Sequence, residues 1–67
     1  MKKGIKAELI SIGTELLRGE ITDTNAVYIA SQLPKVGIEL QGMTTAGDDT
    51  KMLAQAFRQA LRRSDLV

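Results

Sequence analysis

The chain has 67 residues, and its nine Lys and Arg residues nearly balance its eight Asp and Glu residues, which gives a formal net charge of +1. This length allows one small domain, and a near-neutral charge with only two aromatic residues gives no basis for a nucleic-acid partner. No Cys or His is present to build a disulfide or a zinc site. No apolar run approaches the about 20 residues of a membrane span, and no signal-peptide core follows the basic start. We therefore expect a cytoplasmic protein without a membrane partner.

The first half of the chain predicts a strand, a polar loop and a helix. A nearly continuous apolar run at residues 7–12 predicts a buried parallel strand near 6–13, after a solvated lead-in at residues 1–6. A helix is predicted near residues 24–35, and Pro34 should stop or kink it. Its start can be capped by Thr22, Asp23 or Thr24. Its apolar positions are Ala26, Ile29, Ala30 and Leu33.

The second half repeats this plan. A strand is predicted at residues 38–46, with Gly42 as a point of close backbone approach. A helix is predicted near residues 49–63, capped by Asp48 or Asp49. Its apolar stripe, expected in the core, is Met52, Leu53, Ala56, Phe57, Ala60 and Leu61. Residues 65–67 read as the start of a third strand beside the first. The order predicts an α/β fold with three layers, in which helices cover both faces of a parallel sheet.

Acidic residues follow both predicted strands. They are Glu15, Glu20, Asp23, Asp48 and Asp49. Because the carboxyl ends of parallel strands share one edge of a sheet, we expect these carboxylates to lie close together. Clustered carboxylates repel one another, and a Mg²⁺-like ion bound by one or two of them and by substrate phosphates would relieve that repulsion. The alternative, which spacing alone favours, is that the Asp residues cap helices and the Glu residues face water.

The loop after the first strand carries a weaker signal for phosphate binding. Gly13 and Thr14 can present backbone amides and a hydroxyl to a phosphate, but neither a Gly-x-Gly-x-x-Gly motif nor a P-loop is present. Gly13 is equally well explained as the residue that ends the strand. Arg18 can contact phosphate or balance neighbouring Glu residues. Without His or Cys, a catalytic triad is not expected.

A succession of motifs resembles a known family. The most specific are Gly-Thr-Glu-Leu-Leu-Arg-Gly at residues 13–19 and Asp-Thr-Asn at 23–25, followed by Ala-Gly-Asp-Asp at 46–49 and Arg-Ser-Asp-Leu-Val at 63–67. Together they resemble the amino-terminal domain of the competence/damage-inducible protein A (CinA) family, which has the molybdopterin-binding fold of molybdenum cofactor biosynthesis. The resemblance runs from about residue 6 to residue 67.

The resemblance implies a three-layer α/β domain that binds a small phosphorylated nucleotide or pterin at the ends of its strands. In the CinA branch it implies metal-dependent ADP-ribose pyrophosphatase activity. The alternatives are a molybdopterin site or a fragment without activity of its own. The matching ligand-binding residues are Gly13, Thr14, Glu15, Asp23, Thr24 and Asn25. Asp48 matches the catalytic aspartate, and the resemblance leaves Asp48 or Glu15 to hold the divalent metal, Mg²⁺ or a similar ion.

The short third strand raises an expectation about the extent of the domain. Residues 65–67 supply only the start of a strand, whereas strands usually have about five to six residues. The apolar edge of the first strand would then attract another chain or segment. We expect residues 1–67 to be a truncated amino-terminal part of a single domain. Its partner would be a second copy or the remainder of a longer chain.

Overall fold

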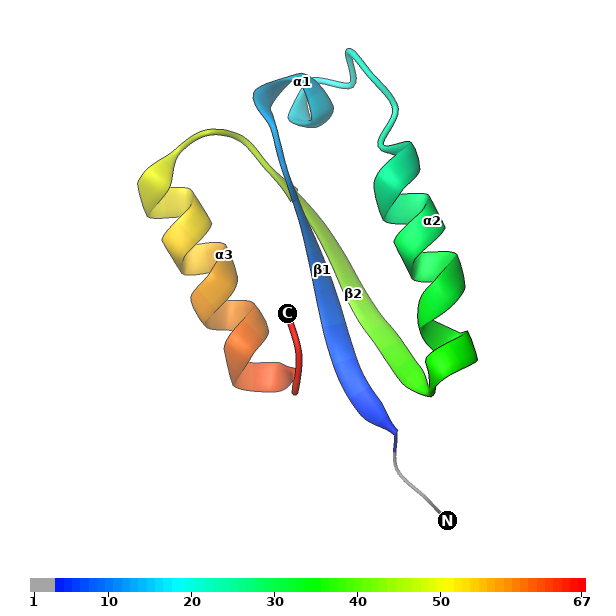
Figure 1. Cartoon of the computed structure of the whole chain (residues 1–67). Helices are drawn as coiled ribbons and strands as arrows, with labels where there is room; N and C mark the ends of the chain where they lie inside the picture. Colours follow the sequence, from blue (N-terminus) through cyan, green and yellow to red (C-terminus); the bar gives the residue numbers. More distant parts are fainter. Residues whose placement is uncertain (1–3) are drawn as a thin grey trace.

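Two parallel strands form the centre of the fold, and helices lie on both sides of them (Figure 1). The structure is a computed structural model that describes residues 4–67. Its elements in chain order are β1 (Ile5–Ile12), α1 (Thr14–Leu17), α2 (Thr24–Gln32), the 3-10 helix η1 (Leu33–Val36), β2 (Ile38–Ala46) and α3 (Thr50–Arg63). This arrangement confirms the predicted α/β class, the parallel pairing of the first two strands and the helices that follow them.

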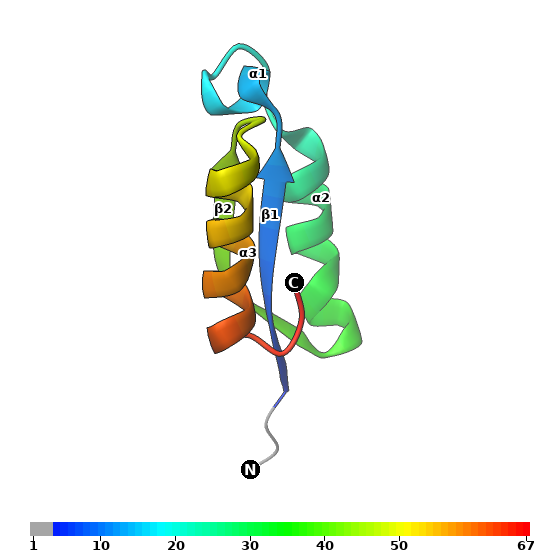
Figure 2. The same cartoon turned by 90° about the vertical axis from the view of Figure 1, so that its left-hand side faces the viewer.

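Strand β1 occupies the middle of the sheet. It pairs with β2 from Ile5 opposite Ile38 to Ile12 opposite Ala46. On its other edge, Ala7 forms a parallel bridge with Leu66, and Figure 2 shows the carboxyl-terminal segment on the side of β1 away from β2. The third strand therefore begins beside the first, as predicted. Helix α3 lies on one side of this sheet and α2 on the other.

Two features of the first half differ from the prediction. Strand β1 begins at Ile5, which pairs with Ile38 of β2, so the strand starts one residue before the predicted 6–13 and the expected lead-in is too long. Residues 1–3 lie outside the described part of the chain. The expected loop after β1 contains the one-turn helix α1, and Gly19, two residues after this helix, has a φ of 75°. A single turn is too short to show a helical period in sequence.

Pro34 acts as the sequence predicts. Helix α2 ends at Gln32, and Pro34 lies inside the 3-10 turn that follows. Gly37 then reverses the chain into β2 with a φ of 79°, in the left-handed region that glycine adopts at little cost.

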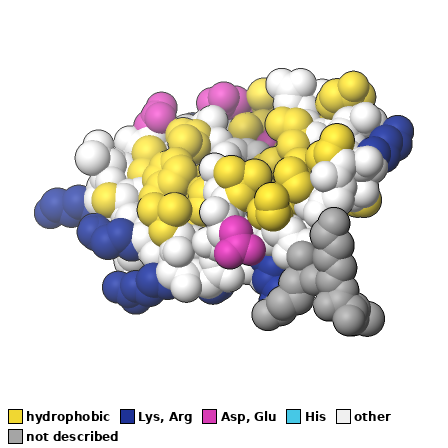
Figure 3. Space-filling model, turned by 60° about the horizontal axis from the view of Figure 1, so that its bottom comes forward, with side chains coloured by type: hydrophobic (Ala, Val, Ile, Leu, Met, Phe, Trp, Pro, Cys, Tyr) yellow, Lys and Arg dark blue, Asp and Glu magenta, His cyan; other side chains and the backbone are white. Residues whose placement is uncertain are grey.

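Small side chains form the core of the described residues. The buried apolar residues are Ala7, Ala26, Ala46 and Ala60, one from each main strand and helix. The expectation that the whole α3 stripe is buried is therefore wrong. Met52 and Leu61 are 65% and 61% exposed, since the short sheet covers only part of the helix. Figure 3 shows hydrophobic side chains gathered over the middle of one face.

None of the helices within residues 4–67 combines the length and the apolar character that crossing a membrane requires.

Each long helix begins at an aspartate that caps it. Asp23 accepts a hydrogen bond from the backbone N–H of Ala26 at 3.0 Å, and so caps α2. Asp49 accepts from the N–H groups of Lys51 and Met52 at 3.0 and 3.1 Å, and so caps α3. Of the two candidates before α3, Asp49 is therefore the cap, and the Asp48 side chain is left for another role.

We expect Asp49→Ala to lower the free energy of unfolding by about 1 kcal/mol, because two amide groups lose their acceptor. The matched control is Asp48→Ala, which should change stability by less than about 0.5 kcal/mol. Urea denaturation followed by circular dichroism measures both values. Equal losses in the two variants would contradict this assignment of the cap.

Candidate functional site

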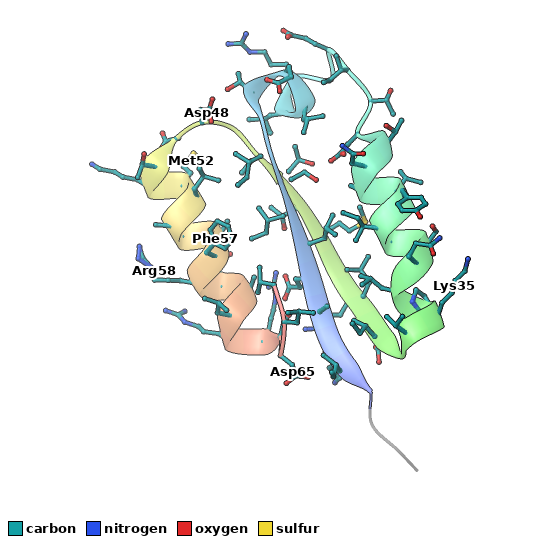
Figure 4. All side chains as sticks on the ribbon, in the orientation of Figure 1. Lys35, Asp48, Met52, Phe57, Arg58 and Asp65 are labelled. Atoms are coloured by element: carbon teal, nitrogen blue, oxygen red, sulfur yellow. The ribbon has the colours of Figure 1, made fainter. Side chains whose placement is uncertain are left out.

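The loops that follow β1 and β2 contact each other at the carboxyl edge of the sheet. Strand pairing continues into the first loop, where the Gly13 N–H donates to the Ala46 carbonyl at 2.8 Å. Beyond it, the hydroxyl oxygen of Thr14 accepts from the backbone N–H of Asp48 at 3.4 Å. Figure 4 shows Asp48 on the connection between β2 and α3. Thr14 and Asp48, which are 34 residues apart in sequence, are therefore neighbours.

Two glycines leave room where the two loops meet. A Cβ atom on Gly47 would lie 3.3 Å from Cδ2 of Leu17 and 3.6 Å from Oγ1 of Thr14. A Cβ atom on Gly13 would lie 2.7 Å from Oε1 of Glu15, so the bare backbone leaves room for that carboxylate. The strand ends thus combine close backbone packing with three polar side chains, those of Thr14, Glu15 and Asp48.

Arg18 lies on the same loop but is paired with a neighbour. Its Nη1 is 3.7 Å from Oε2 of Glu20, and both side chains are largely exposed. An exposed pair of this kind contributes little to stability, so Arg18 can turn toward an anion at low cost.

A second group of predicted residues lines an open groove along the edge of β1 beside α2. This groove, called the α2-side cavity below, has a volume of about 350 Å³. Its polar lining includes Ser11, Asp23 and Asn25, and its apolar lining includes Leu16, Ile29 and Val67. Ligand cavities commonly combine an apolar wall with a few polar groups in this way. Thr24, the first residue of α2, is exposed.

Asp23 is one of two ionisable groups in the lining of the α2-side cavity whose charge the structure stabilises, and Glu8 is the other. The nearby Ser11 hydroxyl and the hydrogen bond from the backbone N–H of Ala26 hold the pKa of Asp23 below its usual value, with Ser11 the larger cause. A lowered pKa means that this group stabilises the fold above the pKa that it has when unfolded. That stabilisation is lost as the pH falls through the folded pKa.

A smaller pocket lies on the opposite side of α1. This α3-side pocket has a volume of about 190 Å³ and is lined by residues that include Leu17, Gly47, Asp49, Met52 and Ala56. Leu16 lines the α2-side cavity and Leu17 lines the α3-side pocket. Successive leucines of the one-turn helix α1 thus contribute to the two hollows.

The structure divides the predicted site residues into two groups. Gly13, Thr14, Glu15 and Asp48 lie on the two touching loops, while Asp23, Thr24 and Asn25 lie at the start of α2. Within residues 4–67, no three acidic side chains come close enough together to hold a metal ion. The carboxylates therefore share an edge of the sheet without forming a ready-made metal cluster.

Sequence reasoning missed the role of Ser11. It treated this residue only as a nucleophile without a base, whereas Ser11 lines the α2-side cavity together with Asp23 and lowers the pKa of that carboxyl. The available signal was a hydroxyl residue near the end of an apolar strand, two positions before Gly13. That signal does not reveal its partner, which is set by where α2 packs.

Comparison with known proteins identifies relatives over almost the whole chain. Residues 8–67 match the family model described as a probable molybdopterin binding domain. A CinA-like protein from Kosmotoga olearia is 49% identical over 63 residues, which cover 94% of this chain and 15% of that protein. The chain thus spans a small fraction of this relative's length.

A solved structure has the same fold. It is the crystal structure of the protein CinA, titled as of unknown function, from Thermoplasma acidophilum. The match has a TM-score of 0.87 and 32% sequence identity, and it covers 97% of this chain and 39% of that one. These findings confirm the resemblance to the CinA family that the motifs indicate.

We expect Ser11→Ala to raise the pKa of Asp23 toward its usual value, because the larger of the two causes that lower it is removed. The carboxyl carbon shift of Asp23, followed by NMR over acidic pH, measures this directly. Ser31→Ala is the matched control, since the Ser31 hydroxyl donates to the Tyr28 carbonyl within α2. An unchanged Asp23 titration in Ser11→Ala would show that the hydroxyl does not support the carboxylate.

Proposed function

The chain belongs to the family of probable molybdopterin binding domains, and from this we propose that its strand ends bind a small phosphorylated pterin or nucleotide. Molybdopterin is the ligand that the family description favours. The observation that carries the proposal is the contact between the two loops at Thr14 and Asp48. It brings the matching motif residues from both strand ends to one place.

The chemistry of this edge suits a phosphorylated ligand. In open α/β sheets, ligands bind outside the carboxyl ends of the strands. Gly13 and Gly47 keep the backbone bare there, while Thr14 supplies a hydroxyl. Arg18 is the positively charged side chain on the same loop as Gly13 and Thr14. Its weak ion pair with Glu20 leaves it available to bind a phosphate. The ring of the ligand would need an apolar wall, which both the α2-side cavity and the α3-side pocket offer.

A divalent ion fits this proposal if the ligand supplies part of its shell. Mg²⁺ is usually held by one or two carboxylates together with substrate phosphates and water, so a cluster of three acidic side chains is not needed. Asp48 and Glu15 are the residues that would hold it. Such an ion would neutralise charge on a diphosphate and activate water for attack.

A second candidate function is hydrolysis of a nucleotide diphosphate such as ADP-ribose by the longer protein that contains these residues. The observation that favours it is the division of roles between the two aspartates before α3. Asp49 takes the capping hydrogen bonds, while the carboxylate of Asp48 is exposed at the strand edge. An aspartate that is not needed as a cap is available to hold a metal or to orient water.

The test is calorimetric titration of the longer domain with molybdopterin and with ADP-ribose, each with and without Mg²⁺. We expect molybdopterin to bind, and Thr14→Val to weaken it, because the hydroxyl at the loop contact is removed. If ADP-ribose is the substrate, Asp48→Asn should lower its turnover by about 100-fold or more without loss of folding, since Asp49 keeps the cap.

A separate experimental result would contradict each part of the proposal. No binding of either compound would overturn the proposed ligand class. Binding of ADP-ribose with unchanged turnover in Asp48→Asn would remove Asp48 from the catalytic role. Ser31→Ala is the control for loss of a hydroxyl, because the Ser31 hydroxyl donates to the Tyr28 carbonyl within α2 and lines neither hollow.

A further inference from the structure

We propose that Glu8, Arg63 and Ser64 form a clamp that fixes where the chain leaving α3 joins the edge of β1. These three residues are called the Glu8 clamp below. The inference concerns the position and register of the third strand and does not depend on which ligand the domain binds.

The clamp is built around a buried carboxylate. Glu8 is 4% exposed and is the one charged residue in the core of residues 4–67. Nε of Arg63 lies 2.6 Å from its Oε2, and Nη2 of Arg63 lies 2.8 Å from its Oε1. The Ser64 hydroxyl donates to Oε2 at 2.6 Å. Charge-assisted, two-pronged pairs of this kind are among the strongest and most directional in proteins.

The chain directly after the clamp is bound to the backbone of β1. The N–H groups of Asp65 and Leu66 donate to the Lys6 carbonyl at 2.8 and 3.1 Å, and the Glu8 N–H donates to the Leu66 carbonyl at 2.9 Å. The Asp65 carboxylate also accepts from the Lys6 N–H at 2.9 Å. Figure 4 shows Asp65 beside the start of β1. Glu8 therefore positions the third strand through two contacts. Its side chain binds the end of α3, and its backbone N–H binds Leu66.

The bulge in β2 makes room for the clamp and is tied to it. Gln41 is the extra residue between the pairs Ala7–Leu40 and Glu8–Gly42. Its side-chain amide donates to the Arg63 carbonyl at 2.6 Å and to Oγ of Ser64 at 2.8 Å. A Cβ atom on Gly42 would lie 3.2 Å from Oε1 of Glu8, so glycine leaves the space that the carboxylate fills. The end of α3 is therefore joined to both strands.

The buried Glu8 carboxylate favours one register of the third strand along β1, whereas apolar contacts alone would allow more than one. Leu66 and Val67 would bury similar apolar surface if the strand shifted along β1 by two residues, because side chains on one face repeat with period two. Such a shift would pull Arg63 and Ser64 away from Glu8. It would leave a buried carboxylate without partners, which is strongly unfavourable.

The charge state of the clamp is stable over the ordinary pH range. Hydrogen bonds from Arg63, and then from Ser64, lower the pKa of Glu8 to about 2. The carboxylate is therefore ionised at neutral and mildly acidic pH. The register that the clamp sets places Val67 in the wall of the α2-side cavity.

The test compares amide hydrogen exchange in Arg63→Met and in Arg62→Met. Both variants remove one cation from the last turn of α3, but Arg62 is not part of the clamp. We expect Arg63→Met to speed exchange of the Glu8, Asp65 and Leu66 amides by about 10- to 100-fold, since a buried charge loses its main partner. The Gly13 and Leu33 amides, which are bonded elsewhere, should change by less than about threefold. Arg62→Met should leave all five within about threefold.

Two further variants keep the test decisive if Arg63→Met is severely destabilised. Ser64→Ala removes one hydrogen bond and should speed the same three amides by about two- to tenfold. Adding Glu8→Gln to Arg63→Met removes the unpaired charge and should restore part of their protection. Equal effects of Arg63→Met and Arg62→Met would overturn the clamp. So would faster exchange throughout the chain in Ser64→Ala, or the absence of protection at Leu66 in the unaltered chain.

Discussion

The parallel pairing of β1 with β2 is the constraint on which the arrangement of the candidate site depends. Because the strands run in the same direction, α2 must carry the chain back across one face of the sheet, and both strand ends meet at one edge. The Gly13–Ala46 hydrogen bond extends that pairing by one residue beyond the strands. It thereby sets the distance at which Thr14 meets the backbone of Asp48. The polar residues of the two loops are neighbours for this reason.

The small size of the core side chains accounts for two features of the fold. The helices lie close to the sheet, and large apolar side chains beside the core remain exposed. Alanine is the buried apolar residue in β1, β2, α2 and α3 alike, so the backbones approach closely at those points. Phe57 and Leu61 on α3, and Ile29 on α2, lie beside this narrow contact and retain 37%, 61% and 42% exposure. Much of the apolar surface beside β1 is therefore open, and Leu66 with Val67 covers only its beginning.

Glu8 gives the fold specificity that this small apolar core lacks. Its partner Arg63 is 60% exposed, and an ion pair that is open to solvent contributes little, so stability alone is a weak reason for the pair. Its geometry offers a better one, since the carboxylate binds two side chains from the end of α3 and its own amide binds Leu66. The same residues thus join the last helix, the central strand and the start of the third strand.

The sequence by itself determined the order and type of the main strands and helices. The apolar period of α3, the stop at Pro34 and the start of a third strand at residues 65–67 are local properties, and local chemistry predicts them. Only the tertiary structure decided that Asp49 and not Asp48 caps α3, that Ser11 supports Asp23, and that Glu8 is buried. Each of these depends on which distant backbone or side chain lies within hydrogen-bond reach. Nothing in the run of residues 7–12 reveals that Arg63, 55 positions away, neutralises its glutamate.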